Sequence, residues 1–216
     1  MLRRRFLLLL SVVGALAWAV PVPARAADAT DQSAKQFVAD LTHNVIGVMT
    51  AKDMSETQRI DRFRSLFIGS VDLPVVGKLV LARYWRVATP DQRQEFLKLF
   101  SDMLVLTWSH RFKDAAGEVT LHITDSKPDV DNGVRVDSEI LRPNQDPVPV
   151  IWRLRRPEGK LRVIDLVVAG TSMVLTYRSE YASVITEHGG QVGALLDALR
   201  KKVAQLSAPT AAAVAN

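Results

Sequence analysis

The sequence predicts an α+β protein in which helices pack on one face of a twisted four-stranded antiparallel sheet. Before residue 113 and after residue 172, apolar side chains recur three or four residues apart, the spacing of amphipathic helices. Between residues 119 and 169 they alternate with polar side chains, which is the period of a half-buried strand. Short turn signals separate these strands, as in an antiparallel meander, so we expect the helices to cover its apolar face.

The first 26 residues have the three parts of a cleavable secretion signal. Arginines at positions 3–5 precede an apolar run over 6–20, and the triplet Ala24-Arg25-Ala26 favours cleavage before Ala27. A retained transmembrane anchor is the alternative, but a serine and a glycine interrupt the run, which is shorter than the ~20 apolar residues of a membrane span. The general secretory and twin-arginine export routes both remain open.

Charge and composition exclude several classes of function. The signal holds four arginines and no acid, so its removal lowers the formal net charge from +5 to about +1 and leaves no electrostatic basis for nucleic-acid binding. The chain has no cysteine, which excludes thiol catalysis and a cysteine-ligated zinc site. No second apolar segment of membrane-spanning length follows the signal, so we expect a soluble domain held together by its core.

The first half of the expected domain is helical. Amphipathic helices are predicted over residues 31–51 and 56–68, and a glycine ends the second one. Asp72 is positioned to cap a short helix over 73–81, whose side chains are apolar nearly all round. Such a segment must be covered on most sides or must line an apolar space.

A longer helix is predicted to begin at the capping box Thr89-Pro90-Asp91-Gln92, which has proline at the first helical position. It runs to about Lys113 and carries a broad apolar face. Strands follow over residues 119–124, 134–140, 148–154 and 161–169, with turn signals at 131–133 and 157–160.

Two helices complete the expected fold. Residues 170–172 end the sheet and begin a helix that reaches Ile185, and a glycine pair at 189–190 separates it from a last helix with apolar positions to Val203. The alanine-rich stretch 207–216 is predicted to be a disordered tail. One domain is therefore expected over residues 27–206.

Few residues offer a pattern that supports catalysis. The four histidines, His43, His110, His122 and His188, are dispersed and lack the spacing of metal ligands. Asp165 is an acid within an otherwise apolar strand, and ketosteroid isomerases use an aspartate base in an apolar cavity of a similar fold. The favoured interpretation is that Asp165 points away from any cavity and pairs with an arginine such as Arg153 or Arg162.

Two separated segments resemble the MlaC, or toluene-tolerance, family. The first is residues 80–96 (VLARYWRVATPDQRQEF), similar to a family pattern of Leu-Gly, Tyr-Trp and Glu-Gln followed by Phe. The second is residues 163–181 (VIDLVVAGTSMVLTYRSEY), similar to a pattern with Asp, Gly, Ser and Tyr-Arg at the same spacing. The resemblance spans about residues 35 to 200, with helices and strands in matching order.

The resemblance implies a periplasmic lipid carrier with an NTF2-like cone, in which an apolar cavity lies between the helices and the sheet. It implies a bound phospholipid, a hopanoid in a related branch, and no cofactor, metal or catalysis. It also implies two partners: an outer-membrane lipoprotein complex, and an inner-membrane ABC transporter with its membrane-anchored lipid-binding subunit. Such a carrier contributes to outer-membrane lipid asymmetry.

Apolar side chains on the expected helices and strands are the candidate lipid-binding residues. They are Val75, Val76, Leu79, Val80, Phe96, Phe100, Met103, Val136, Val150, Trp152, Val167, Val174 and Tyr177. The segment Arg83-Tyr84-Trp85 is a candidate for the cavity mouth, and Arg178 for a head-group or partner contact. Each of these side chains has an alternative role in an ordinary core or surface.

The chain departs from the family pattern at Ala82, Ala169, Thr171 and Thr176. None of these changes removes an apolar wall residue, but they weaken assignment to the phospholipid branch and leave a hopanoid open. Two further hypotheses remain: a small-molecule isomerase or hydrolase on the same scaffold, and a lipid-free adaptor of a transporter complex.

Overall fold

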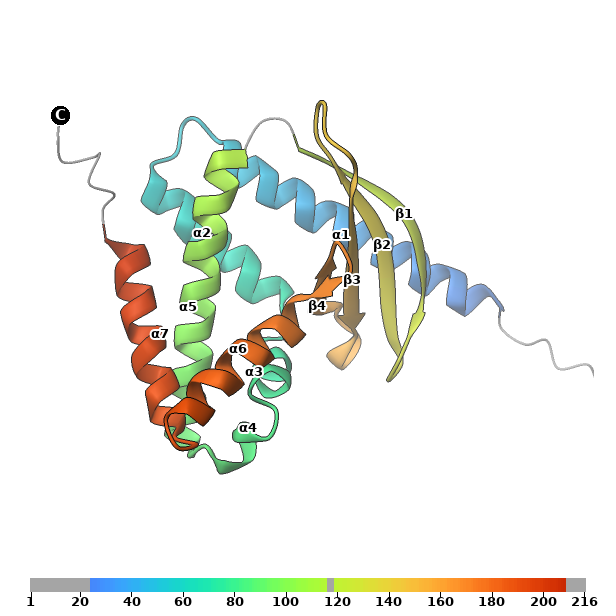
Figure 1. The fold of residues 1–216 in the computed structure, drawn as a ribbon. Coiled ribbons are helices and arrows are strands. Elements are labelled where there is room, and N and C mark those ends of the chain that lie inside the picture. Colours follow the sequence, from blue (N-terminus) through green and yellow to red (C-terminus); the bar gives the residue numbers. More distant parts are fainter. Residues whose placement is uncertain (1–23, 116–118, 209–216) are drawn as a thin grey trace, which may run out of the picture.

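The computed structural model describes residues 24–115 and 119–208 (Figure 1). Residues 1–23 of the expected signal and 209–216 of the expected tail lie outside the described part of the chain. The first helix, α1, spans Ala24–Thr50 and the last one, α7, spans Val192–Ser207. The domain boundaries at residues 26 and 206 therefore stay predictions.

The two N-terminal helices are present, although α1 begins seven residues before the expected start at residue 31. After α1, helix α2 spans Glu56–Ser70 and begins with a capping box. The Ser55 backbone N–H donates to Gln58 Oε1 (2.8 Å), while the Ser55 hydroxyl accepts from the Gln58 N–H (3.2 Å). This reciprocal pair satisfies two of the N–H groups that a helix start leaves open.

Three helices follow: α3 (Leu73–Leu81), α4 (Tyr84–Val87) and α5 (Pro90–Ala115). The Asp72 carboxylate accepts from the Val75 N–H (3.3 Å), as expected for the cap of α3. The predicted box at the start of α5 is also present, with Thr89 and Gln92 bonded at 3.0 and 3.2 Å. The four-residue helix α4 was not expected from the sequence, because one turn carries too little periodicity to detect.

The sheet is an antiparallel meander with strand order β1-β2-β3-β4-β5. The strands are β1 (Thr120–Asp129), β2 (Gly133–Leu141), β3 (Val148–Arg155), β4 (Arg162–Val168) and β5 (Thr171–Ser172). The α+β class is confirmed, but the sheet has five strands and not four. Ala169 and Gly170 both have positive φ (48° and 81°), and this tight turn lets residues 171–172 pair with β4 before the next helix begins.

Strand β1 is longer than predicted and forms one edge of the sheet. It continues through Asp125, Lys127 and Pro128, residue types that are depleted in central strands but tolerated at edges. Its register with β2 shifts between Ile123 and Asp125, as in a β-bulge.

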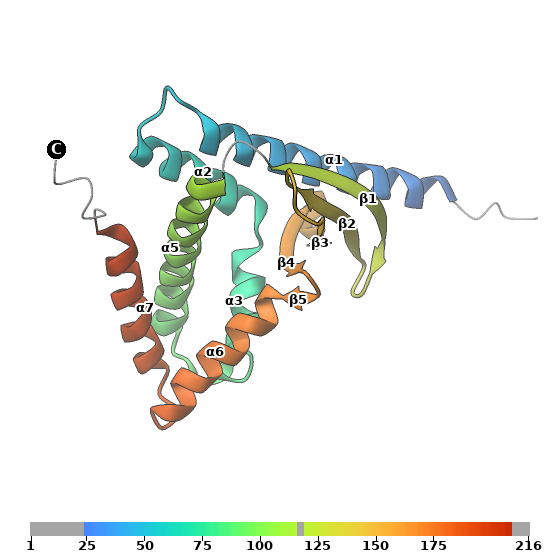
Figure 2. The same cartoon turned by 45° about the horizontal axis from the view of Figure 1, so that its top comes forward.

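Helices α6 (Met173–Glu187) and α7 pack with α3 and α5 into a helical layer beside the sheet (Figure 1). Figure 2 shows α1 running along the sheet and continuing to α2, so that it contacts both halves of the molecule. One part of the core joins α1 to the sheet through Ala34, Val38, Val136 and Leu154. A larger part fills the helical layer around Phe96, Phe100, Tyr181 and Leu195.

The outer face of the sheet carries ion pairs. Arg153 Nε lies 2.7 Å from Asp129 Oδ2, and Lys127 Nζ lies 3.2 Å from Asp137 Oδ2. Burial acts to raise the pKa of Asp129, but the hydrogen bonds from Arg153 and the backbone hold it below its ordinary value. In residues 24–115 and 119–208, no helix combines the length and apolar character that crossing a membrane requires.

Candidate functional site

An apolar hollow of about 200 Å³ lies between the sheet and helices α1, α2 and α5. The sheet and the residue before β1 contribute Val119, Leu121, Ile140, Val150, Trp152, Val163, Leu166 and Val168. The helices and the residue after α2 contribute Leu41, Thr42, Val45, Ile46, Phe63, Phe67, Ser70, Val71 and Trp108. The alternation of the strands aims one face of the sheet at this space, while helical periodicity aims the apolar sides of the helices at it.

The polar groups in this wall are mostly satisfied within the protein. The Trp152 indole N–H donates to the Ser138 hydroxyl (3.0 Å), which in turn donates to the Val150 carbonyl (2.9 Å). The Ser70 hydroxyl donates to Leu66 O (2.7 Å). The buried Thr42 hydroxyl has no hydrogen-bond partner among the described residues. The wall thus has little capacity to hold water.

A second hollow, of about 80 Å³, adjoins the first between α3, α5, α6 and β4. Five residues line both spaces: Phe67, Val71, Trp108, Val163 and Leu166. The two hollows are therefore separated by side chains, and not by a helix or strand that lies between them. An apolar space of this size stays dry and favours an apolar ligand, because each buried CH₂ group contributes about 0.8 kcal/mol.

Seven of the thirteen candidate wall residues line these hollows. Val76, Val80, Phe100, Val174 and Tyr177 line the smaller one, while Val150 and Trp152 line the larger one. They come from α3, α5, α6 and β3, so the fold brings together residues that are up to a hundred positions apart in the sequence.

Three candidates lie in closed core. Phe96 stacks on Phe100 with ring centroids 5.4 Å apart and meets the Tyr181 ring edge-on at 6.0 Å. Met103 belongs to the same buried cluster, and Val136 packs against α1. None of the three is among the residues that line the two described hollows, so their contact with a ligand stays a prediction.

The remaining candidates point elsewhere. Leu79 is 36% exposed, and Val75 is half-buried on the same side of α3. Val167 pairs with Ile151 and Ser172, on the face of the sheet opposite to Trp152 and Leu166. In a strand with alternating apolar and polar residues, the sequence shows which side chains face the core. Strand β4 is apolar on both faces, so its sequence does not show that Val167 lies on the opposite face from Leu166.

None of the wall residues on α1 and α2 was among the candidates. Leu41, Val45 and Phe63 were recognised only as parts of amphipathic helices, and the structure places them on the larger hollow. Their helical spacing shows which side of the helix is covered, but it is the same for a filled core and for a cavity wall.

Asp165 has a structural role at the start of α6. Its carboxylate accepts hydrogen bonds from the Ser172 hydroxyl (2.6 Å) and the Val174 backbone N–H (3.0 Å). The expected arginine partners are bonded elsewhere, Arg153 to Asp129 and Arg162 to carbonyls at the end of α2. The predicted pairing of Asp165 with an arginine is therefore wrong, since the partially positive helix N-terminus provides the partner. The expectation that Asp165 points away from any cavity is also wrong, because Asp165 is among the residues that line the smaller hollow.

Among the other titratable groups, the Tyr177 phenol belongs to the wall of the smaller hollow. Burial raises the pKa of the Tyr177 and Tyr181 phenols, so both stay protonated at neutral pH. His122 faces Glu139 (3.9 Å) and His188 contacts the Val184 carbonyl (2.7 Å). Within the described ranges, no group of three or more acidic or histidine side chains is arranged to hold a metal ion.

The candidate mouth residues are engaged in contacts between helices. Arg83 donates to the Tyr84 hydroxyl (2.7 Å), which contacts the Thr186 hydroxyl on α6 (2.9 Å). The Arg93 guanidinium lies 5.5 Å from the Trp85 ring centroid. Arg178 donates to the Leu79 carbonyl (2.8 Å) and so ties α6 to the end of α3.

Together, the fold and the two hollows define an α+β protein that encloses an apolar space between a sheet and a layer of helices. The family model described as MlaC protein matches residues 39–201 of the chain. The chain therefore belongs to the MlaC family. This confirms the resemblance that the two sequence segments indicated.

Two comparisons with individual proteins agree with the family. The chain is 21% identical over 123 residues to the intermembrane phospholipid transport system binding protein MlaC of Haemophilus influenzae. That match covers 55% of this chain and 57% of the relative, so it spans little more than half of the relative's length. The fold is similar to a phospholipid-binding protein of Ralstonia solanacearum solved in complex with a phospholipid, with a TM-score of 0.70 and 23% identity over 81% of this chain and 99% of that one.

Proposed function

We propose that the protein is a periplasmic carrier that binds the acyl chains of a phospholipid in its two adjoining hollows. It moves the lipid between an outer-membrane lipoprotein complex and an inner-membrane ABC transporter with its membrane-anchored lipid-binding subunit. The observation that carries this proposal is the pair of apolar hollows between the sheet and the helices. The predicted secretion signal supports the location.

Burial of the acyl chains supplies the affinity. At about 0.8 kcal/mol for each CH₂ group, two long chains are held firmly without directional contacts. Release requires a second apolar cavity that receives the chains, and no bond has to be broken. This is why the carrier needs no catalytic group. The names of the Haemophilus and Ralstonia proteins, which refer to phospholipid transport and phospholipid binding, support the same ligand class.

Loading also requires the hollows to widen. Their volumes of about 200 and 80 Å³ both lie below the range of about 300–1,000 Å³ that is common for drug-sized ligands. A phospholipid with two long chains is larger still. The side chains shared by both hollows, such as Trp108 and Phe67, are the ones whose movement joins the two spaces.

Mass spectrometry of the protein purified from its periplasmic fraction tests the proposal. We expect a co-purified phospholipid and a mature mass that corresponds to a chain beginning at Ala27. A co-purified hopanoid would instead support the related branch of the family. A lipid-free protein that gains no lipid from vesicles would contradict the carrier and favour an adaptor role.

A cavity-filling variant tests the wall. Val45 lines the larger hollow from α1, so V45W places an indole ring into the space that the acyl chains occupy. We expect lipid loading from vesicles to fall at least tenfold. Asn44 is the neighbouring residue in the same helix and is exposed, so N44W is the matched control and should load normally.

Loading of V45W at the wild-type level, with an unchanged circular dichroism spectrum, would show that the larger hollow is not the binding site. A lower melting temperature of V45W would not by itself explain a loss of lipid loading. The loading assay is carried out well below the unfolding transitions of V45W and N44W, so both variants are folded during the assay.

A further inference from the structure

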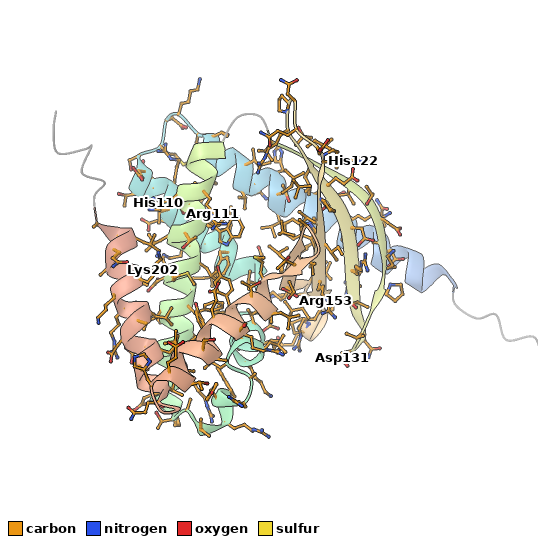
Figure 3. All side chains as sticks on the ribbon, viewed as in Figure 1. His110, Arg111, His122, Asp131, Arg153 and Lys202 are labelled. Atoms are coloured by element: carbon orange, nitrogen blue, oxygen red, sulfur yellow. The ribbon has the colours of Figure 1, made fainter. Side chains whose placement is uncertain are left out.

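Arg111 is a cation beside Trp108, a residue that lines both hollows. It lies near the C-terminal end of α5, one turn after Trp108, which lines both spaces. The Arg111 guanidinium is 5.4 Å from the centre of the Trp108 ring. Figure 3 labels Arg111 on the upper part of α5.

A second wall residue is close to the same charge. Tyr177 lines the smaller hollow from α6. Burial and the negative charge of Glu180 raise the pKa of its phenol, whereas the positive charge of Arg111 acts in the opposite direction. Arg111 therefore lies within electrostatic range of side chains on two helices that border the hollows.

The Arg111 guanidinium is available to a ligand. It is exposed, and among the side chains that the structure describes it makes no ion pair or hydrogen bond. By contrast, Arg64, Arg153 and Arg200 each have a carboxylate partner. The cation–π contact holds the guanidinium over the indole and leaves its N–H donors at the edge of the group free to bind.

We propose that Arg111 binds the phosphate of a phospholipid whose acyl chains occupy the two hollows, and that it selects phospholipids over neutral lipids of the same chain length. The inference rests on the proposed function. Guanidinium and phosphate form paired charge-assisted hydrogen bonds, which a neutral lipid cannot provide. The acyl chains supply most of the affinity, and Arg111 supplies the discrimination between head groups.

A competition experiment tests the selection. Delipidated protein is incubated with vesicles that contain equal amounts of dioleoyl phosphatidylglycerol and dioleoylglycerol, and the bound lipids are quantified by mass spectrometry. We expect the wild-type protein to prefer the phospholipid by about tenfold, the effect of one exposed charge-assisted contact. R111Q should bind both lipids to a similar extent, and R111K should keep part of the preference because it retains the charge but not the paired geometry.

R86Q is the matched control. Arg86 is an exposed arginine on α4, at the opposite end of α5 from Arg111 (Figure 1), and its loss removes the same charge from the protein. It should leave the preference unchanged. Equal loss in R86Q and R111Q would show that net charge, and not a contact with Arg111, produces the selection.

The outcomes separate the two proposals. If the wild-type protein binds the two lipids equally, or if R111Q keeps the full preference while total loading is normal, the role of Arg111 is overturned and the carrier function stands. If the wild-type protein binds neither lipid, the carrier function fails together with the inference.

Discussion

Ala82 occupies a backbone conformation that side chains rarely adopt. It follows α3 with φ 47° and ψ −116°, and its N–H donates to Lys78 O (3.0 Å) to close the helix. Glycine adopts such angles without a steric cost, whereas an L-residue stores strain of about 1–3 kcal/mol. The family pattern that residues 80–96 resemble has glycine at this position, so the alanine is a departure that introduces local strain.

A82G should therefore stabilise the protein by about 1 kcal/mol, after allowance for the greater freedom of glycine in the unfolded chain. The free energy of unfolding in urea measures the effect. Ala182, in the middle of α6, is the control, because A182G should destabilise by about 1 kcal/mol through lost helix propensity. A loss of stability in A82G of the same size as in A182G would contradict the strain.

Sequence reasoning at the scale of residues works best where one local interaction decides the outcome. The capping box of Thr89 and Gln92 was predicted and is present, since both partners lie within four residues. The partner of Asp165 was not predictable in this way. An acidic side chain on a strand can bind an arginine or a helix N-terminus. Which of the two lies next to Asp165 depends on where the chain turns after β4 into β5 and begins α6.

Helix α6 depends on that acid. Asp165 on β4 and Ser172 at the helix start together provide acceptors for the first N–H groups of α6, since the Ser172 hydroxyl also accepts from the Leu175 N–H (3.1 Å). Asp165 is buried (8% exposed), and its two carboxylate oxygens face the helix N-terminus, the end of the helix dipole that favours acceptors.

D165A should lower the free energy of unfolding by about 2 kcal/mol, because a buried charged hydrogen-bond acceptor is lost. D165N keeps an oxygen for the Val174 N–H and should lose less than half as much. Urea unfolding of both variants measures the difference. Equal losses would show that packing of the side chain matters and that its acceptor oxygens do not.

Elements were predictable where the apolar period is long. Helices α2, α5 and α6 and the central strands lie close to their expected positions, whereas α1 begins seven residues before its expected start at residue 31. Helix α4 and strand β5 were missed because they contain four and two residues. Strand β1 was predicted too short. Its charged residues and Pro128 are compatible with an edge strand only. Which strand forms an edge depends on the arrangement of the whole sheet, so the pattern of β1 alone did not predict its length.

The hollow is a property of the whole molecule. Leu41 on α1 and Phe96 on α5 have the same type of periodic spacing in the sequence, yet one lines a cavity and the other lies in filled core. Periodicity reports the covered side of each helix. It does not report the distance between the sheet and the helices, which depends on how α1 bridges the two halves.

Removal of the lipid should lower the stability of the whole molecule. A ligand that binds only the folded state stabilises it by about 2.7 kcal/mol when its free concentration is a hundred times its Kd. We expect delipidated protein to unfold several degrees below the loaded form in a thermal scan. V45W, with its larger hollow filled, should show little change on delipidation. An identical melting temperature for loaded and delipidated wild-type protein would contradict binding inside the fold.

The outer edge of β1 affects how readily the protein aggregates at high concentration. A carrier that repeatedly opens an apolar interior is exposed to aggregation through any free strand. The edge strand β1 contains Lys127 and Pro128, and its register shifts after Ile123. These features interrupt the regular row of backbone N–H and C=O groups with which another chain would pair to extend the sheet. If the protein opens to exchange lipid, as proposed, the sheet edges of open molecules are therefore poor templates for pairing with one another.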